Sequence, residues 1–422
     1  MRQIKFSFFL FLVLFSSYIK AQTTKEEFTN DLKQSGGIYR VYNYVKSTAA
    51  SAPNGYKPFY MSHYGRHGSR WIQTPQTYTG VHNVLSGAYK AGKLTKLGES
   101  LLKRVEIIAE DAFGKYGDLS PLGVIEHKAI AERMYNSFPE IFSTDNSRKC
   151  FIYSRSTPVP RCIISMAANN ERLKELNPKI EILREPYAKN SYLNNSYTNT
   201  KKDSTASIID DFLKKHLNCE VIISRIFSDP EYVNTKIANK ISFVRDLNLI
   251  NSDLLDVAHL NISMADILFP NELFVLWQAA NLNMYYTCGP SAINGKVAMD
   301  SSKQLLKNIL ECADNAINHG DVSADLRFGH DSYIIPLLAL MDVENMNIIE
   351  NNPENVYKVW SDFKVSPMGA NLQMIFFKKE GSSDILVKFL HNENEVSIPV
   401  KTDKYPFYHW SDVKTYYKAK LN

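Results

Sequence analysis

The sequence predicts an α/β fold in which a discontinuous core carries an inserted α-helical cap. Strand-like and helix-like patterns alternate over residues 22–190 and again over residues 293–422, the two parts of the predicted core. Between them, residues 191–292 look helical and lack clear strands, which predicts an α-rich cap. In addition, 44% of the residues are hydrophobic and 12% aromatic, enough for a sizeable globular core.

The first part of the predicted core begins with a helix that breaks at Gly36 and Gly37. Residues 58–65 are rich in β-forming residues and end in glycine, so we expect a strand that runs into a loop. Ser120 is expected to cap a helix whose first residue is Pro121. The other patterns are strand-like at 150–157 and 179–187, and helical at 78–113, 119–142 and 157–176.

The cap and the second part of the core follow the same logic. Helical patterns in the cap cover residues 207–217, 220–227, 232–250 and 272–286. Behind the cap, a helix over 301–320 closes at Gly320, and residues 324–341 run from a strand into a helix. The remaining patterns are late strands at 368–379, 384–396 and 397–400, with a turn at residues 392–394.

The first 21 residues read as a secretory signal peptide. Arg2 and Lys5 form a basic start, residues 6–15 are apolar, and Ala21 is a small residue suited to the last position before cleavage. A retained membrane anchor is the alternative, but an apolar run this short spans a bilayer poorly. We therefore expect an exported protein, periplasmic or secreted, without stable membrane insertion after the signal is removed.

The charge balance excludes one class of partner. Cleavage after residue 21 leaves 46 basic and 44 acidic residues, so the formal charge falls from +5 to +2. A nearly neutral chain argues against nucleic acid as the main partner. Any cationic binding site must therefore be local.

Such a local site is present in the stretch RHGSR, where Arg66 and Arg70 flank His67 at the end of a predicted strand. Two guanidinium groups can each present a fork of N–H groups to phosphate oxygens, and a neutral imidazole between them can attack phosphorus. A solvated basic loop is the alternative from spacing alone. A metal site on His63 and His67 is a third interpretation, but no flanking carboxylate completes it.

Two further clusters lie downstream. His330 and Asp331 stand between a strand-like and a helical segment, where the histidine can donate to a phosphate oxygen and the carboxylic acid can protonate a leaving alkoxide. The alternative is an aspartate that only caps the following helix. Arg161 opens a predicted helix after a strand and can point towards the ligand end of a sheet, although a surface arginine is the default interpretation.

These clusters, in this order, resemble the histidine phosphatase superfamily, specifically its acid phosphatase and phytase branch. RHGSR is similar to the branch's RHGxR motif, GHDS to its HD motif, and LSPLG to its L-T-x-x-G stretch. The segments RFGHDSYIIPLLALM and FLHNENEVSIPV resemble the multiple inositol polyphosphate phosphatase subgroup in particular. The resemblance spans nearly the whole mature chain.

The resemblance implies a fold with a mixed central sheet flanked by helices and an inserted α cap. It also implies roles for six residues: His67 as nucleophile, Asp331 as proton donor, and a site for the scissile phosphate made by Arg66, Arg70, Arg161 and His330. Arg155 competes with Arg161 for its role, but PRCIIS is closer to the family pattern R-C-x-x-S. The family needs no metal, and we expect no cofactor.

The expected activity is hydrolysis of small-molecule phosphate esters, with inositol hexakisphosphate and lower inositol phosphates as favoured substrates. The subgroup commonly has H-A-E where this chain has His330, Asp331 and Ser332, which places the donor carboxylate one position earlier. The alternatives are a broad-specificity acid or sugar phosphatase and a catalytically silent phosphate-binding protein. Basic side chains that could select a polyphosphate include Lys189, Lys201 and Lys202.

Overall fold

The computed structural model describes residues 23–422 except 43, 46–49, 146–148, 194–201 and 295. The predicted signal peptide lies outside the described residues. Among those that are described, no helix is long and apolar enough to cross a lipid bilayer.

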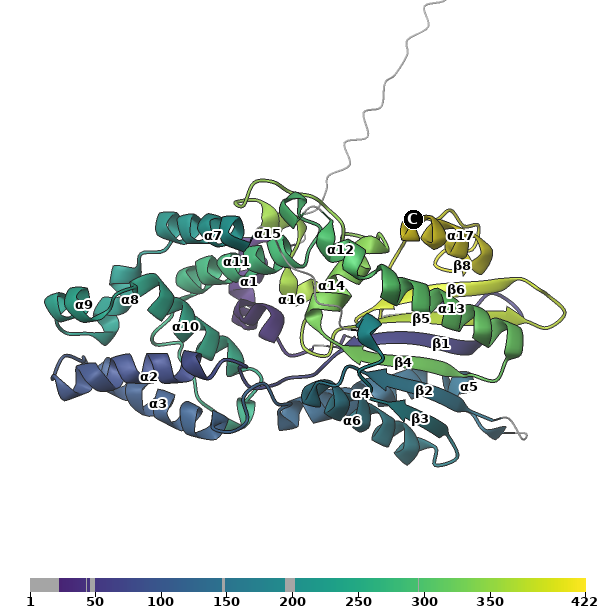
Figure 1. The fold of residues 1–422 in the computed structure, drawn as a ribbon, viewed down its shortest axis with the longest axis horizontal. Coiled ribbons are helices and arrows are strands. Elements are labelled where there is room, and N and C mark those ends of the chain that lie inside the picture. Colours follow the sequence, from purple (N-terminus) through teal and green to yellow (C-terminus); the bar gives the residue numbers. More distant parts are fainter. Residues whose placement is uncertain (1–22, 43, 46–49, 146–148, 194–201, 295) are drawn as a thin grey trace, which may run out of the picture.

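A single mixed sheet, at the right in Figure 1, is the core around which the α/β part of the molecule is built. The strand order is β3-β2-β4-β1-β5-β6-β7, with β8 paired to β6. The four strands β3, β2, β4 and β1 are parallel to one another, whereas β5 pairs antiparallel with β1 and β6 antiparallel with β5. The strands are β1 Tyr56–Arg66, β2 Phe151–Ser156, β3 Glu181–Glu185, β4 Ala324–Gly329, β5 Asn371–Lys379, β6 Ile385–His391, β7 Asn394–Glu395 and β8 Tyr408–His409.

The register of the parallel strands brings distant parts of the chain to one edge of the sheet. Arg66 at the end of β1 lies opposite Gly329 at the end of β4, and Ser156 at the end of β2 lies opposite Phe328. The segments that follow these three strands therefore begin side by side. Ligands in α/β folds bind at such carboxyl ends of strands.

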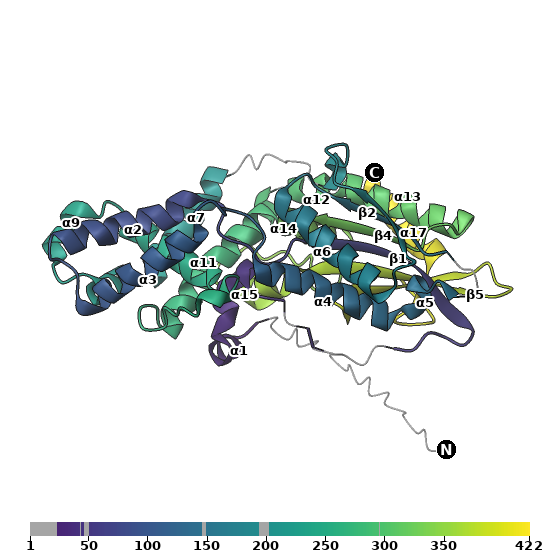
Figure 2. The same cartoon turned by 90° about the horizontal axis from the view of Figure 1, so that it is seen from below.

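Helices cover both faces of the sheet, and each face has its own apolar cluster (Figures 1 and 2). On one face, α4, α5 and α6 pack through residues such as Ile130 and Met166 against Met61 and Phe328 of the strands. On the other, α13, α14 and α17 pack against residues that include Tyr64. These helices are α4 Pro121–Ser137, α5 Pro139–Phe142, α6 Pro160–Leu176, α13 Lys303–His319, α14 Asp331–Leu340 and α17 Trp410–Leu421. This layering confirms the predicted fold class.

A helical lobe extends from the sheet, at the left in Figure 1. Its predicted part contains α7 Lys202–His216, α8 Cys219–Ile226, α9 Pro230–Lys236, α10 Lys240–Asp253, η4 Ala258–Leu260 and α11 Pro270–Thr287. Two earlier helices join them, since α2 packs against α10 and α3 against α8. These are α2 Pro75–Lys90 and α3 Lys96–Ala112, from a range that the sequence prediction gave to the core. The division into core and cap stays a prediction.

The N-terminal segment connects the lobe to the sheet edge. Helix α1, Lys25–Asn30, leads into the 3₁₀ segment η1, Leu32–Tyr39, which packs against α10 and α11. Gly37 has φ 54°, a conformation that glycine adopts without strain, and it lies at the predicted helix break. This turn brings Ile38 and Tyr39 towards the loop that follows β1.

Several local expectations can be checked directly. Ser120 does cap α4, because its hydroxyl accepts a hydrogen bond from the Gly123 N–H at 3.4 Å. The predicted helix over 78–113 is two helices, which separate at a turn where Gly92 has φ 67°. The predicted strand at 397–400 was wrong, since these residues form no regular element. The shorter helical elements are η3 Ser191–Leu193, η5 Ala292–Asn294, α12 Val297–Ser301, α15 Val356–Val359 and α16 Asp362–Val365.

Candidate active site

The loop Arg66–Arg70 is fixed to the sheet edge by its backbone. The Arg66 N–H donates to the Ala370 carbonyl at 2.7 Å, and the His67 N–H donates to the Gly329 carbonyl at 2.9 Å. The Gly369 N–H in turn donates to the His67 carbonyl at 3.0 Å. The loop, which we call the arginine loop, is thus held between the end of β4 and the segment before β5.

Gly68 is required by the close approach of α4. A Cβ atom at this position would lie 2.7 Å from both the Cα and the carbonyl oxygen of Gly123, closer than real Cβ atoms come. The Ser120 N–H donates to the Ser69 carbonyl at 2.8 Å, which draws the two segments together. The glycines of RHGSR and LSPLG therefore form one contact.

His67 lies at the centre of the loop with only 2% of its surface exposed. Its Nδ1 lies 2.9 Å from the Gly68 carbonyl oxygen. Because a carbonyl can only accept, Nδ1 carries the proton and the lone pair is on Nε2. Burial, then the charges of Arg66, Arg70 and Arg161, hold the pKa of His67 well below its usual value. The imidazole is therefore neutral, the form that can act as a nucleophile.

Arg66 is fully buried and fixed by three partners. Its Nη1 donates to the carbonyls of Ile38 and Ser366 at 2.6 and 2.8 Å, and its Nη2 lies 3.0 Å from the Asp331 carboxylate. These contacts orient the guanidinium before any ligand binds. Such preorganised charge is what stabilises developing negative charge in a site sheltered from water.

Arg70 is held on the other side of the loop by Trp71 and Tyr39. Its Nη1 donates to the Trp71 carbonyl at 2.9 Å, and its Nη2 donates to the Tyr39 hydroxyl at 3.3 Å. The guanidinium carbon also lies 5.0 Å from the centre of the Tyr39 ring, within the range of a cation–π contact.

His330 joins the cluster from the end of β4. Its ring centre lies 5.7 Å from that of His67, and its backbone N–H donates to the Tyr64 hydroxyl at 3.2 Å. Arg161 Nη2 lies 3.4 Å from its Nδ1, and the Thr157 hydroxyl lies 3.3 Å from its Nε2. Since an arginine can only donate, Nδ1 is the acceptor. Burial and the charge of Arg161 lower the pKa of His330 to about 4.

Asp331 is the first residue of α14. Its Oδ1 accepts from the Ser332 N–H at 2.7 Å, its Oδ2 pairs with Arg66, and the side chain remains 20% exposed. Burial alone would raise its pKa, but the charges of Arg66 and Arg70 outweigh burial and lower it. In this state the carboxyl group is therefore ionised.

The structure also separates the two candidate arginines. Arg161, near the start of α6, contacts His330 and donates to the Gly117 carbonyl at 3.4 Å. Arg155 lies inside β2 and forms ion pairs with Glu185 and Asp325. Of these two arginines, Arg161 thus belongs with the other predicted site residues, because it contacts His330 and its charge acts on His67.

A metal site on His63 and His67, the third interpretation of these residues, does not fit the course of the backbone. His63 lies inside β1, so His63 and His67 do not share a helix face. The His63 ring packs 5.4 Å from the Phe328 ring, within the apolar cluster beside α4. Across the described part of the chain, no group of three His, Cys, Asp or Glu side chains is placed to hold a metal ion.

Sequence reasoning missed four residues that support the arginine loop or His330. Tyr39 and Tyr64 hydrogen-bond to Arg70 and His330, and Glu126 and Asp256 hydrogen-bond to the backbone of Ser69 and Arg70. Glu126 stands three residues after the glycine of LSPLG, a spacing that could have drawn attention to it. The other three lie in no motif, and only the fold reveals their contacts.

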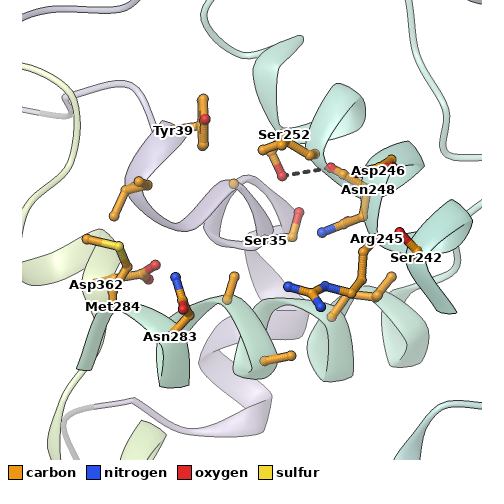
Figure 3. A pocket seen from close by; sticks show the side chains of 16 residues that line it. Ser35, Tyr39, Ser242, Arg245, Asp246, Asn248, Ser252, Asn283, Met284 and Asp362 are labelled. Carbon is orange, nitrogen blue, oxygen red and sulfur yellow. Dashed lines mark hydrogen bonds between the residues drawn. The ribbon is translucent and has the colours of Figure 1, made fainter. Parts of the chain in front are cut away.

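A separate cavity of about 440 Å³ lies between η1, α10 and α11 (Figure 3). Ile38 and Tyr39 form part of its wall, so η1 stands between this cavity and the arginines. None of the six predicted site residues lines it. Its charged side chains, Arg245, Asp246 and Asp362, are mostly acidic, unlike the arginine-rich site.

Comparison with known protein families places the chain. The model of the histidine phosphatase superfamily (branch 2) matches residues 66–392, well over half of the sequence. The chain belongs to this family. The matched range of this histidine phosphatase starts within the arginine loop and ends one residue beyond β6. A search of curated proteins found no significant sequence match.

Solved structures share the fold of this histidine phosphatase. Bifidobacterium longum multiple inositol polyphosphate phosphatase, complexed with inositol hexasulfate, aligns with a TM-score of 0.79 at 16% identity, over 92% of this chain and 98% of that one. The D. castellii phytase aligns with a TM-score of 0.64 at 15% identity, over 92% and 85%. Hafnia alvei phytase, complexed with myo-inositol hexakis sulphate, aligns with a TM-score of 0.52 at 13% identity, over 88% and 98%.

Proposed function

We propose that this histidine phosphatase is an exported phosphomonoesterase that hydrolyses inositol hexakisphosphate and lower inositol phosphates through a phosphohistidine on His67. The observation that carries the phosphohistidine is the neutral His67 imidazole, whose free Nε2 lies among three arginines. The similarity over nearly the full length of an inositol polyphosphate phosphatase supports the substrate class.

The proposed reaction has two steps. First, the Nε2 lone pair of His67 attacks phosphorus while the P–O ester bond breaks, and Asp331 gives its proton to the departing alkoxide. In the second step, ionised Asp331 takes a proton from a water molecule, whose oxygen bonds to phosphorus as the P–N bond breaks. Inorganic phosphate leaves, and His67 regains its lone pair.

In this scheme Arg66, Arg70, Arg161 and His330 bind the scissile phosphate. The Nε atoms of all three arginines lack a hydrogen-bond partner among the described residues, so they retain donor capacity. A bound phosphate would also become a partner of Arg66 in place of Asp331. The loss of that pairing raises the pKa of Asp331, which favours the protonated form that the first step needs.

Asp331 takes the role of donor from the first turn of α14. The position is one residue earlier than in the H-A-E pattern, yet the carboxylate reaches Arg66, beside His67. Of the basic side chains considered for polyphosphate selection, Lys189 pairs with Glu185 at 3.1 Å. Lys201 and the Lys202 side chain lie outside what the structure describes.

The test is release of inorganic phosphate from inositol hexakisphosphate and from glucose 1-phosphate by the purified mature chain, with EDTA present. We expect fast release from the inositol substrate, and a loss of roughly 10⁴-fold or more in His67→Ala. Release from glucose 1-phosphate alone would contradict the inositol assignment but keep the chemistry. No release from either substrate would favour a silent binding protein.

Export is a separate part of the proposal. Residues 1–21 have the basic start, apolar run and small residue of a signal peptide. Mass spectrometry of protein recovered from outside the cytoplasm should find Gln22 as the first residue. An intact N-terminus would contradict cleavage.

A further inference from the structure

Three buried carboxyl groups lie behind the arginine loop, and we call them the carboxylate cluster. Glu126 comes from α4, Asp253 is the last residue of α10, and Asp256 follows in the turn before η4. Glu126 is 7% exposed and the two aspartates are fully buried. Two members thus come from the helical lobe, whereas the arginine loop follows the first strand of the sheet.

Each member of the cluster holds part of the segment 69–72. Glu126 accepts hydrogen bonds from both the N–H and the hydroxyl of Ser69 at 2.8 Å. Asp256 accepts from the Arg70 N–H at 3.4 Å. Asp253 accepts from the Tyr78 hydroxyl at 2.7 Å, and the oxygen of that hydroxyl accepts from the Ile72 N–H at 2.9 Å. The cluster therefore fixes the backbone that carries Arg70.

The cluster also faces the charges of the phosphate pocket, the proposed binding site made by Arg66, Arg70, Arg161 and His330. Burial raises the pKa of all three carboxyl groups, that of Glu126 to about 7, and the charges of Asp253 and Glu126 raise that of Asp256 further. The arginines act in the opposite direction, Arg66 on Glu126 and Arg70 on both aspartates. Arg66 also interacts with Asp256. Among the described residues, other groups that act on the cluster include Tyr42, Ser69, the backbone of Ile72, Tyr78 and Asp111.

Two atoms of the cluster are poorly suited to hold charge. Oδ1 of Asp253 and Oδ1 of Asp256 are buried and have no hydrogen-bond partner among the described residues. An ionised oxygen in such a place is costly unless a nearby cation compensates it. The compensation comes from the same arginines that a bound phosphate would engage.

We propose that the carboxylate cluster positions the arginine loop and takes up a proton when an anionic ligand fills the phosphate pocket. The bound anion offsets the positive charge of the arginines, so the buried carboxylates lose their stabilisation and become protonated. Phosphate binding therefore weakens as the pH rises through the range in which the cluster ionises. The inference rests on the proposed function for the anion-binding role of the arginines and for the choice of the first probe.

The test is calorimetric titration with myo-inositol hexakissulfate, a ligand whose own charge is constant between pH 5 and pH 7. The binding enthalpy is measured in two buffers of unequal ionisation enthalpy. The difference between the two binding enthalpies gives the number of protons taken up. At pH 7 we expect about half a proton or more per bound ligand through the cluster, because Glu126 is then half ionised. At pH 5 the cluster is already protonated and its contribution vanishes.

Variants assign the proton to the cluster. Asp253→Asn and Glu126→Gln should each reduce the uptake at pH 7, because both groups have a pKa of about 7, whereas Asp246→Asn should leave it unchanged. Asp246 is a matched control because it lies in the same helix as Asp253 but lines the separate cavity. If the proton went to His67, His330 or Asp331 instead, the uptake would be equal in all three variants, and that result would overturn the proposal. The absence of any uptake by the wild type would also overturn it.

Positioning has its own readout. Asn at 256 keeps an oxygen that can accept from the Arg70 N–H, so Asp256→Asn should retain kcat, whereas Asp256→Ala should lose roughly tenfold or more. Equal kcat in the two variants would contradict a positioning role. If the hexasulfate fails to bind but inorganic sulfate binds with proton uptake, the inositol assignment falls and the cluster proposal stands. If neither inositol hexakissulfate nor inorganic sulfate binds, both the inositol assignment and the cluster proposal are contradicted.

Discussion

At the scale of single residues, nearby partners set the protonation of two side chains, His67 and Asp331. A backbone carbonyl keeps the His67 proton on Nδ1, so Nε2, the proposed nucleophile, carries the lone pair. The charges of Arg66 and Arg70 keep Asp331 ionised. In the proposed mechanism a bound phosphate replaces Asp331 as the partner of Arg66, so the same guanidinium would bind phosphate and control when the acid can be protonated.

Asp331→Asn should separate substrates by the basicity of their leaving groups. An alkoxide leaves poorly without a proton, whereas p-nitrophenolate hardly needs one. We expect kcat to fall by roughly 10²-fold or more on an inositol phosphate and far less on p-nitrophenyl phosphate. Steady-state kinetics on both substrates gives the answer, and equal losses would show that Asp331 is only structural.

The pattern of residues that sequence reasoning found has a physical cause. Arg66, His67 and Arg70 stand out because three side chains suited to the proposed phosphoryl chemistry fall within five positions of one another. His330 and Asp331 stand out because they are adjacent. Asp256 acts through one hydrogen bond between distant segments, and a single buried aspartate leaves no such mark on the sequence.

At the scale of elements, the N-terminus of α4 sets the shape of the arginine loop. Ser120 and Gly123 lie directly against Ser69 and Gly68, and Glu126, one turn further along the helix, reaches back to Ser69. The arginine loop is thereby fixed in position by its contacts with helix α4. Sequence patterns predicted the helix and its cap, but not that this turn would support the loop.

Gly68→Ala tests this contact, with Gly80→Ala as its control. The new methyl group at 68 would meet the Gly123 backbone, so we expect a loss of about 1–3 kcal/mol in the free energy of unfolding and a large loss of kcat/KM.

Gly80 lies within α2 and has nothing within 4 Å of its added Cβ. Alanine there should leave activity unchanged and stabilise the protein by up to about 1 kcal/mol. Chemical denaturation and kinetics of both variants measure the contrast. A Gly68→Ala protein that behaves like Gly80→Ala would show that α4 can move away at little cost.

At the scale of the whole molecule, the helical lobe and the sheet meet at the site. The lobe contributes Asp253 and Asp256, and the N-terminal segment contributes Ile38 and Tyr39. The order of strands and helices could be anticipated from alternating patterns. The pairing of α2 and α3 with the later lobe helices could not, because amphipathic helices do not specify their partners.

The free energy of unfolding should depend on pH because Glu126 is buried where the lobe and the sheet meet. Glu126 has a pKa of about 7 when folded and an ordinary value of 4.5, so folding favours its protonated form. Below pH 4.5 the group is protonated in both states, and above it the unfolded state ionises first, so the penalty grows until about pH 7.

The stability of Glu126→Gln relative to wild type should therefore increase by roughly 3 kcal/mol from pH 4.5 to pH 7. The buried histidines are common to both proteins and cancel in the comparison. Urea unfolding at a series of pH values measures the difference. A constant difference would mean that Glu126 is not a buried ionisable group of this kind.

The adjacency of β1 and β4 has a consequence for the timing of activity. These strands are neighbours at the centre of the sheet, yet one ends at Arg66 and the other begins at Ala324. Contacts between such distant parts of a chain form slowly, because closing the long intervening loop costs conformational entropy. His67 is synthesised early but meets His330 and Asp331 only when most of the polypeptide has been made, so under the proposed mechanism a nascent chain lacks its acid and should not cleave phosphate esters.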